Sequence, residues 1–288
     1  MARVDRLVIL THQQQGLDPD YFLGRMKRLV WEREGREVLV HQGTRRPPAA
    51  EVAILHIDLT TVPDEYLELA RSYPRCVNAG VADISKRRVS RWLVTAEDAY
   101  DGPVIVKSNF NHSGDPEWRL RRAQGGLGTR LHQVALRWLP PAWGGRFSGY
   151  QLFHRKGQVP AWVWRRGDLV VERFFVEPRG ALFALRQWHF FADRGHVSTI
   201  LSSTPLVKWE NKVALAPIDH DVPEEVWQLR RELGFGFGKF DYVVDQGRPV
   251  VFDTNPTPHF GSDVLRERNL WIIANLASGL DSLAEGRG

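Results

Sequence analysis

The first part of the chain alternates between short apolar runs and amphipathic stretches. Three apolar runs have the length of buried strands: residues 7–10, 37–41 and 52–57. Over residues 21–30 apolar side chains recur at helical spacing, and Gly35 is placed to end that helix. Pro63 opens a second helix over residues 64–73, and residues 76–78 form another short strand. The pattern predicts a layered βαβ domain, without a glycine-rich dinucleotide fingerprint after the first strand.

From about residue 103 onward, longer strands are separated by polar loops. A strand over residues 104–107 ends in Lys107, and a loop rich in Asn, Gly, His and Ser follows over residues 108–114. Further strands are expected over residues 170–175, 182–191, 196–201, 239–244 and 250–255. The second and third of these flank a turn at residues 192–195, which indicates a hairpin. A proline-initiated helix covers residues 223–233, and Ser262 or Asp263 can cap a last helix.

The composition is that of a soluble globular protein. Of the 288 residues, 43% are hydrophobic and 25% are charged, which argues against disorder. No apolar run approaches the ~18–20 residues that cross a bilayer, and the apolar run at residues 7–10 is too short for a signal peptide. The single cysteine, Cys76, excludes an intrachain disulfide and a cysteine-type zinc site. These features favour the cytoplasm and no association with membranes.

The net charge of +5 suits a polyanionic ligand, which leaves a nucleotide, a nucleic acid or a membrane surface. The basic residues are scattered and form no long block, so a nucleic-acid-binding arm is disfavoured but not excluded. Arg119, Arg121 and Arg122 make a small cluster. A homodimer stays open, because nothing in the sequence decides the oligomeric state.

The segment from Lys239 to Asn255 carries the strongest chemical signal. Side chains alternate between the faces of a strand, so Asp253 and Asn255 share one face. If residues 246–248 form a three-residue loop, the register sets Asp241 directly opposite Asp253. Two carboxylates and an amide then converge on one face of the hairpin.

Two neighbouring carboxylates repel and need a proton or a cation. Oxygen ligands without histidine or cysteine indicate a hard ion such as Mg²⁺ or Mn²⁺. The alternative interpretation is a solvent-facing hairpin with ordinary surface acids. A two-residue loop would shift the register and break the cluster.

Lys107, Glu172 and this hairpin come in an order that resembles the ATP-grasp superfamily. Members of that superfamily have a strand-borne lysine before a flexible loop, a linker strand that holds adenine, and a late acidic strand pair ending in Glu/Asp-x-Asn. Here the last element is residues 253–255, twelve residues after Asp241. Residues 172–179 look like the adenine linker of the biotin carboxylase branch.

The resemblance covers residues 83–288 and implies an α/β fold of the α+β ATP-grasp kind. Residues 1–90 would form a Rossmann-like βαβ domain that precedes the ATP-grasp domain. Residues 91–288 would form the ATP-grasp domain, with a small lid subdomain at 91–172 and a metal- and phosphate-binding subdomain at 173–288.

The resemblance also implies roles for the matching residues. Those expected to bind ATP are Lys86, Lys107, Glu172, Phe174, Phe175, Glu177 and Lys212. Those expected to hold Mg²⁺ or Mn²⁺ are Asp241, Asp253 and Asn255. Lys107 would contact the α/β-phosphates, Glu172 the adenine amino group and Glu177 the ribose. The backbone near Phe174 and Phe175 would read the edge of the adenine ring. The loop at residues 109–114 would fold over the triphosphate.

Some roles stay open at this point. Lys107 can also be a solvent-exposed lysine at a strand end, and Glu177 an exposed acid before a turn. A second phosphate-binding base is expected, for which Arg186, Lys208 and Lys212 all qualify. We expect Lys107 and Arg186 to act in catalysis. His259 follows the metal motif and is expected to act as a base or to bind a carboxylate, with a structural role as the alternative.

The chain departs from the family pattern in two places. Lys86 and Lys107 are only 21 residues apart, a shorter interval than usual in the family, so the lid would be trimmed and Arg87 or Arg88 could replace Lys86. Asp253 stands where glutamate is commoner, and its shorter side chain makes bridging of two ions less secure.

The resemblance implies an ATP- and Mg²⁺-dependent ligase. Such an enzyme joins a carboxylate to an amine or thiol through an acylphosphate, and the two substrates are not identified by the sequence. One alternative is a phosphotransferase on the same fold. Another is a non-catalytic protein that binds a nucleotide or a nucleic acid.

Overall fold

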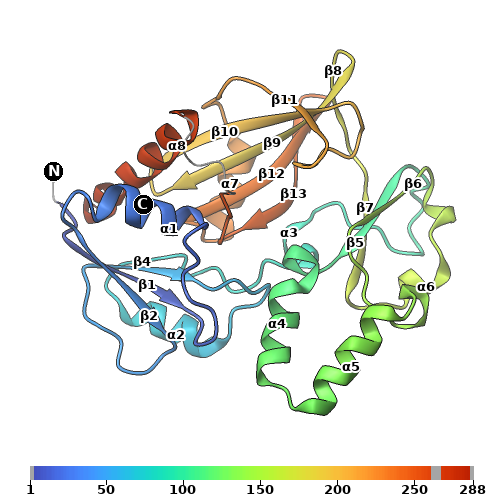
Figure 1. The fold of residues 1–288 in the computed structure, drawn as a ribbon. Helices are drawn as coiled ribbons and strands as arrows, with labels where there is room; N and C mark the ends of the chain where they lie inside the picture. Colours follow the sequence, from blue (N-terminus) through green and yellow to red (C-terminus); the bar gives the residue numbers. More distant parts are fainter. Residues whose placement is uncertain (1–2, 261–266, 286–288) are drawn as a thin grey trace. The chain divides into compact units, whose positions relative to one another are not determined.

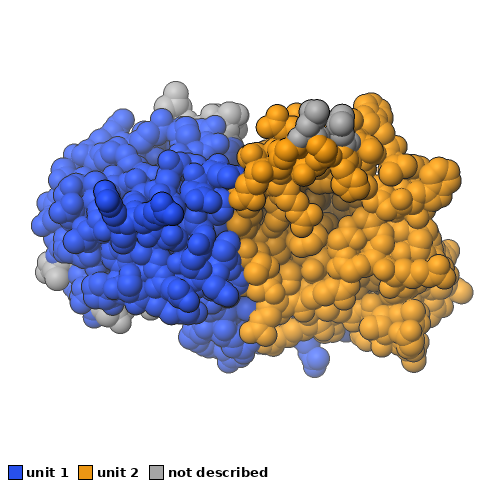
Figure 2. Space-filling model, turned by 90° about the horizontal axis from the view of Figure 1, so that it is seen from below, with its two compact units in different colours: residues 1–58, 62–82, 177–288 blue, residues 59–61, 83–176 orange. Residues whose placement is uncertain are grey.

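The structure is a computed structural model that describes residues 3–260 and 267–285 (Figure 1). The chain divides into two compact units, coloured separately in Figure 2. Unit 1 comprises Met1–Asp58, Val62–Ala82 and Glu177–Gly288, and unit 2 comprises Leu59–Thr61 and Asp83–Val176. The expected domain boundaries at residues 90 and 172 stay predictions.

The N-terminal part of unit 1 is a parallel four-stranded sheet in the order β2-β1-β3-β4. Its strands are β1 (Arg6–Thr11), β2 (Glu37–Gln42), β3 (Val52–His56) and β4 (Cys76–Val77). The helices are α1 (Phe22–Met26), which continues as a π-helical turn over Lys27–Trp31, and α2 (Asp64–Ser72). The strands and helices predicted for this region are confirmed, and Gly35 follows the first helix with a φ of +77°, a conformation that glycine adopts freely.

The second sheet of unit 1 is antiparallel. It runs in the order β11-β10-β9-β12-β13, with β8 also paired to β9. Its strands are β8 (Glu177–Arg179), β9 (Leu182–Phe191), β10 (Arg194–Ser202), β11 (Lys212–Leu215), β12 (Phe237–Asp245) and β13 (Arg248–Asn255). The hairpin of β9 and β10 is confirmed, but its turn is shorter than predicted, because Arg194 already pairs with Phe191.

Helices cover both faces of this sheet (Figure 1). On one face, Trp188 and Phe190 pack with the buried Arg230 of α7 (Glu224–Glu232). On the other, Phe191 and Phe237 join a core shared with α8 (Glu267–Ala277) and with the parallel sheet. The 3₁₀ segment Ser278–Glu285 follows α8. Unit 1 therefore holds its two sheets around one hydrophobic core, which the sequence did not predict.

Unit 2 is built on an antiparallel sheet in the order β6-β5-β7. Its strands are β5 (Val104–Ser108), β6 (Tyr150–Phe153) and β7 (Leu169–Arg173). Its helices are α3 (Lys86–Val89), α4 (Asp115–Gln124), α5 (Leu127–Trp138) and α6 (Ala161–Trp164), with 3₁₀ turns at Asn111–Gly114, Pro141–Trp143 and Lys156–Gln158. The sheet contributes Val104, Val106, Leu169 and Val171 to the core, and the segments around it contribute Val94, Phe147, Val159 and Val163.

The mixed α/β class is confirmed by these sheets and helices. Strand β7 ends at Arg173, so Phe174 and Phe175 lie beyond the strand in which they were predicted. The expected caps Ser262 and Asp263 lie outside the described residues. No helix in the described part of the chain is long and apolar enough to cross a membrane.

Candidate functional site

Strands β12 and β13 bring Asp241 and Asp253 together through a two-residue turn combined with a β-bulge, which the sequence did not predict. The connecting turn has two residues, Gln246 and Gly247, with φ of 48° and 81°, and not the three predicted. Such a turn is favoured in hairpins because its twist matches that of the strands. A bulge at Phe252 adds one residue to β13, which restores the register, and Asp241 pairs with Asp253. The predicted pairing is confirmed, whereas the predicted loop is wrong.

The Asp241 carboxylate is buried in a site that is only partly neutralised. Lys239 Nζ lies 2.8 Å from its Oδ2, and Gln187 Nε2 donates to its Oδ1 at 3.2 Å. Burial raises the pKa of Asp241, the Asp253 charge raises it further, and Lys239 opposes both. Two unit charges ~5 Å apart repel by about 3 kcal/mol at an effective dielectric of 20. Carboxylate oxygens paired in this way are ligands that suit a hard cation.

Asn255 fits the expected metal less well than the two aspartates. Its Oδ1 accepts hydrogen bonds from the backbone N–H of Thr257 at 2.8 Å and from Thr257 Oγ1 at 3.1 Å. Thr257 Oγ1 also lies 2.9 Å from Asp58 Oδ1, so its single proton is shared between two acceptors. A metal at Asn255 would therefore compete with Thr257 for the amide oxygen, and the carboxylates are the better ligands.

Arg186 lies on the other face of the sheet from these carboxylates. Gln187 is the β9 partner of Asp241 and contacts it, so the neighbouring Arg186 side chain points to the opposite face. There Arg186 forms a two-pronged ion pair with Glu177, at 2.9 and 3.0 Å. The structure does not bring Arg186 to the carboxylates, as a base for the terminal phosphates beside the metal would require.

Glu177 is buried and fully engaged within unit 1, not the exposed acid that was the alternative interpretation. Arg186 and Arg179 bind its Oε1, and the backbone N–H of Val244 donates to its Oε2 at 2.8 Å. Burial alone would raise the pKa of Glu177, but Arg186, Val244 and Arg179 together lower it. Both oxygens are occupied, so this geometry leaves Glu177 little capacity for a ribose hydroxyl.

Lys212 lies on β11, three strands from β12 in the sheet order. Its Nζ is 3.6 Å from the ring centroid of Trp209, a cation–π contact. The structure does not place Lys212 beside Asp241 or Asp253.

In unit 2, Lys107 and Glu172 form a buried ion pair. Lys107 Nζ lies 2.8 Å from Glu172 Oε2, and the two side chains are 5% and 2% exposed. Lys107 is thus not a solvent-exposed lysine at a strand end. Glu172 Oε1 is buried and has no hydrogen-bond partner in the described part of the chain. A buried acceptor of this kind is costly unless a ligand donates to it, and an adenine amino group is such a donor.

The segment that carries Lys86 is tied to the loop after β5. The backbone N–H of Lys86 donates to the carbonyl of Asn109 at 3.0 Å, and the Lys86 side chain is buried. Later in this loop His112 and Ser113 have φ of 45° and 56°, and Gly114 of 75°. Left-handed backbone at non-glycine residues stores strain and is enriched at functional sites. Unit 2 therefore gathers two buried lysines, one buried glutamate and a strained loop.

Phe174 and Phe175 follow β7 and have contacts of their own. The backbone N–H of Phe174 donates to the Pro103 carbonyl at 2.9 Å, so it is already used. The Phe175 ring packs edge-on against Trp92, with 4.8 Å between the centroids. Reading of the adenine edge by this backbone stays a prediction.

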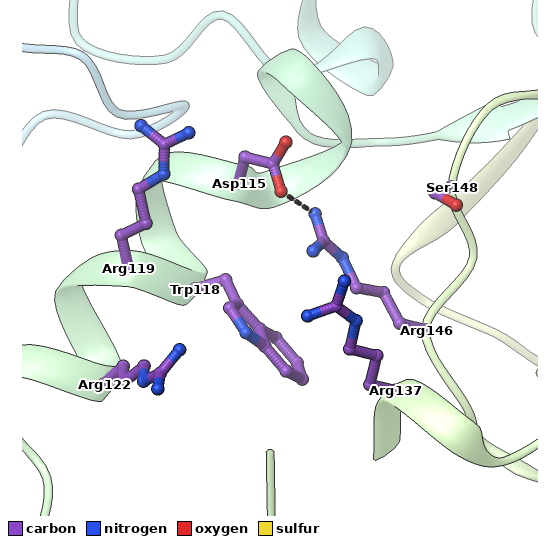
Figure 3. Close-up of a pocket in the computed structure, with 7 residues that line it drawn as sticks. All are labelled: Asp115, Trp118, Arg119, Arg122, Arg137, Arg146 and Ser148. Carbon is purple, nitrogen blue, oxygen red and sulfur yellow. Dashed lines mark hydrogen bonds and ion pairs between the residues drawn. The ribbon is translucent and has the colours of Figure 1, made fainter. Parts of the chain in front are cut away.

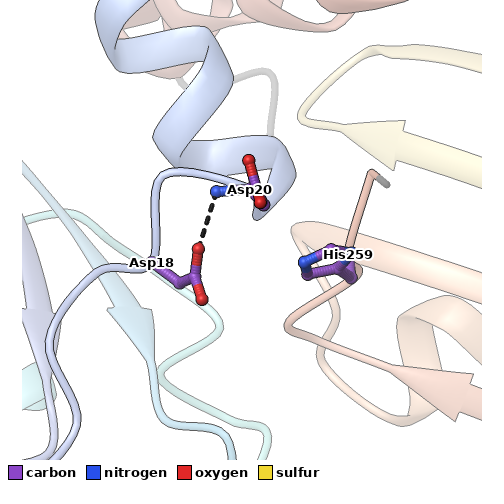
Figure 4. Close-up of side chains that lie close together, drawn as sticks. All are labelled: Asp18, Asp20 and His259. Carbon is purple, nitrogen blue, oxygen red and sulfur yellow. Dashed lines mark hydrogen bonds between the residues drawn. The ribbon is translucent and has the colours of Figure 1, made fainter. Parts of the chain in front are cut away.

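His259 is exposed and lies in unit 1 beside the segment before α1 (Figure 4). It forms a β-bridge with Tyr21, and one ligand atom each of His259, Asp18 and Asp20 lie within 4.8 Å of one another. Arg25 already pairs with Asp20, and the Asp20 backbone N–H donates to Asp18. Roles of His259 as a base or a carboxylate ligand stay predictions.

The sequence interpretation missed Lys239 and Gln187 at the carboxylate site. The signal for Lys239 was present, because a residue two positions before Asp241 must share its face. No comparable signal existed for Gln187, since its approach to Asp241 depends on the register between β9 and β12.

No family model matches the chain, and no curated protein matches it. Among solved structures, the D-cycloserine synthetase DcsG is 13% identical and aligns over 96% of this chain and 99% of its own, with a TM-score of 0.49. A RimK domain ATP-grasp protein from Sphaerobacter thermophilus is 14% identical over 95% and 99%, with a TM-score of 0.45.

The ATP-grasp ligase PsnB, solved with a minimal precursor, Mg and ADP, is 12% identical over 97% and 99%, with a TM-score of 0.47. The chain resembles ATP-grasp ligases.

Proposed function

We propose that this chain is an ATP- and Mg²⁺-dependent ligase that joins a carboxylate to an amine or a thiol. The observation that carries the proposal is the pairing of the buried Asp241 with Asp253 across β12 and β13. A sheet that sets two carboxylates opposite each other gains from a divalent cation, and oxygen ligands select Mg²⁺ or Mn²⁺. Asp241 and Asp253 would hold the ion, with Asn255 as the weaker ligand.

Unit 2 would supply the nucleotide contacts. Lys107 and Lys86 are buried lysines that suit phosphate oxygens, and the unpartnered Glu172 Oε1 suits the adenine amino group. The left-handed backbone at His112 and Ser113 would present amides to the triphosphate. The bound metal would neutralise phosphate charge that develops during the transfer.

In the proposed reaction, a substrate carboxylate oxygen attacks the γ-phosphorus of ATP and ADP leaves. An amine or thiol then attacks the acyl carbon of the acylphosphate, inorganic phosphate leaves, and the nucleophile loses its proton. Positioning and charge neutralisation are the share of the protein in such a reaction. Arg186, Glu177 and Lys212 are not needed for this proposal, because their contacts lie away from Asp241 and Asp253.

The test uses the full chain with ATP, Mg²⁺ and a panel of carboxylates and amines. We expect release of ADP that depends on both substrates and the metal, and a product with the mass of the condensed pair. With an ¹⁸O-labelled carboxylate, one label should appear in the released phosphate. Release of ADP with a stable phosphorylated product would instead identify a phosphotransferase. Binding of ATP without turnover across the panel would favour the non-catalytic alternative.

A further inference from the structure

Unit 2 contains a pocket that belongs to none of the residues expected to bind ATP or metal. It encloses about 360 Å³ and is lined by Asp115, Trp118, Arg119, Arg122, Arg137, Arg146 and Ser148 (Figure 3). A volume of this size holds a small ligand. Four arginines against one aspartate give the pocket a surplus of positive charge.

One of the four arginines is already engaged. Arg146 pairs with Asp115, lies over the Trp118 ring at 5.2 Å, and is 3.3 Å from the Ser113 carbonyl. The side chains of Arg119, Arg122 and Arg137 are different. Within residues 3–260 and 267–285, they have neither an ion pair nor a hydrogen bond to another residue. Three guanidinium groups thus face one small pocket without a countercharge from the described chain.

Arg119, Arg122 and Arg137 are exposed side chains, and they differ from the other arginines of α4 and α5 in that they line the pocket. On α4, Arg119 and Arg122 are three residues apart and share a helix face, whereas Arg121 does not line the pocket. On α5, Arg137 lines the pocket and Arg130 does not. Trp118 adds a flat apolar surface between these charges (Figure 3).

We propose that this pocket binds a small ligand with two or more adjacent phosphoryl groups. Guanidinium groups bind phosphoryl oxygens with paired hydrogen bonds, and unlike lysine they present a planar fork. Adjacent phosphoryl groups concentrate several negative charges in a small volume, which matches three unpaired arginines in 360 Å³. Carboxylates carry one charge each and spread the same charge over a longer molecule. The proposal does not depend on the proposed ligase function.

The test measures binding of pyrophosphate and of tripolyphosphate to the full chain by titration calorimetry. Each titration is run once without nucleotide and once with a saturating Mg²⁺ complex of a non-hydrolysable ATP analogue. The second condition fills any nucleotide site, so that such a site cannot account for the signal. We expect one saturable site per chain in both conditions. The double variant R119A/R122A should bind about tenfold more weakly, because two charge-assisted contacts are lost.

The matched control is R121A/R130A, which removes the same charge from α4 and α5 outside the pocket. Its affinity should stay within about twofold of the native chain, since neither Arg121 nor Arg130 lines the pocket. Equal weakening in both double variants would overturn the proposal, as would the lack of a saturable site.

Asp115 gives a test with the opposite sign. Asp115→Asn removes the negative charge of the pocket and releases Arg146, so tripolyphosphate should bind about threefold more tightly. Glu97→Gln, at an exposed acid of unit 2 outside the pocket, should leave the affinity unchanged. Citrate or a tetra-aspartate peptide that binds as tightly as tripolyphosphate would overturn the phosphoryl assignment in favour of a carboxylate ligand.

Discussion

The two units both bury charged side chains, but they neutralise them in opposite ways. In unit 2, Lys107 and Glu172 form a buried pair of opposite charges at 2.8 Å. In unit 1, Asp241 and Asp253 are like charges held opposite each other, with Lys239 as a partial countercharge. The first arrangement joins opposite charges, whereas the second places like charges together, and a cation bound there would offset their repulsion.

This difference indicates which of the two sites a bound cation would stabilise more. An ion pair that is nearly complete in the protein gains little from a metal, and its ligand is better sought at the free acceptor Glu172 Oε1. Facing carboxylates lose repulsion when a divalent ion binds between them. We therefore expect breaking the Lys107–Glu172 pair to reduce the stability of the fold, and substitutions at the unit 1 carboxylates to act mainly on metal-dependent activity.

The largest change in the free energy of unfolding is expected for Lys107→Met. It leaves Glu172 charged and buried without its partner, which typically costs about 3–5 kcal/mol of unfolding free energy. Urea unfolding monitored by circular dichroism measures this loss. The double variant K107M/E172L should recover most of it, because no unpaired charge remains. A loss below about 1 kcal/mol in the single variant, with no recovery in the double, would mean that the pair is not the buried partnership described here.

The next effect is expected at the carboxylates of unit 1. Asp253→Asn removes one of the two carboxylates proposed to bind the metal. Mg²⁺-dependent release of ADP should therefore fall about 100- to 1,000-fold. The far-ultraviolet circular dichroism spectrum should stay unchanged. Asp221→Asn, at an exposed position of the same unit, is the control and should keep full activity. Full activity of both Asp241→Asn and Asp253→Asn would remove the metal assignment.

A third prediction concerns how the free energy of unfolding depends on pH, to which buried histidines of unit 1 contribute. His196 and His189 are buried in unit 1 and stack at 5.1 Å, and neither nitrogen of His196 has a hydrogen-bond partner in the described chain. Burial, together with the charges of Arg268 and His220, lowers the pKa of His196 to about 3. Burial lowers the pKa of His189 as well, aided by His196 and Lys239.

The folded chain therefore keeps these rings neutral, while the unfolded chain takes up protons below its ordinary histidine pKa of about 6.5. The unfolding free energy should fall as the pH drops from about 6.5 towards 3, by about 2 kcal/mol at pH 5 from His196 alone. His196→Phe should flatten this slope, and His154→Gln, at an exposed position in unit 2, should not. An unchanged slope in His196→Phe would show that other groups set the acid sensitivity.

The local sequence pattern predicted the helices and strands better than it predicted how they pack against one another. The strands and helices of residues 6–77 follow from periodicity and breaker residues, because those signals are local. The shared core of the two sheets in unit 1 does not, since it joins residues such as Ile54 and Phe237 that are far apart in sequence.

The same limit applies to the candidate site. Asp241 and Asp253 were found from alternation and spacing, yet their pairing depends on a bulge at Phe252 that no local rule announces. Arg186 was assigned by its type and its order in the chain. The register of β9 against β12 decides its face, and it pairs with Glu177 instead.

The smallest expected effect is a change in Mn²⁺ affinity on substitution of Lys239. This lysine forms an ion pair with Asp241 in unit 1, as Lys107 does with Glu172 in unit 2. Its ammonium lies 2.8 Å from Asp241 and competes with any cation for that carboxylate. Lys239→Met should therefore tighten binding of Mn²⁺, measured by electron paramagnetic resonance, by about threefold to tenfold, since a nearby positive charge is removed. It should also destabilise the metal-free chain slightly, because the buried Asp241 carboxylate loses its ion pair with Lys239. Lys27→Met removes an ion pair with Glu32 in the helical segment after α1, outside the strands that carry Asp241 and Asp253. It is the matched control and should leave Mn²⁺ binding unchanged. Weaker Mn²⁺ binding in Lys239→Met would mean that the lysine supports the cation site instead of competing for it, and the contrast between the two units would then be smaller than their charges suggest.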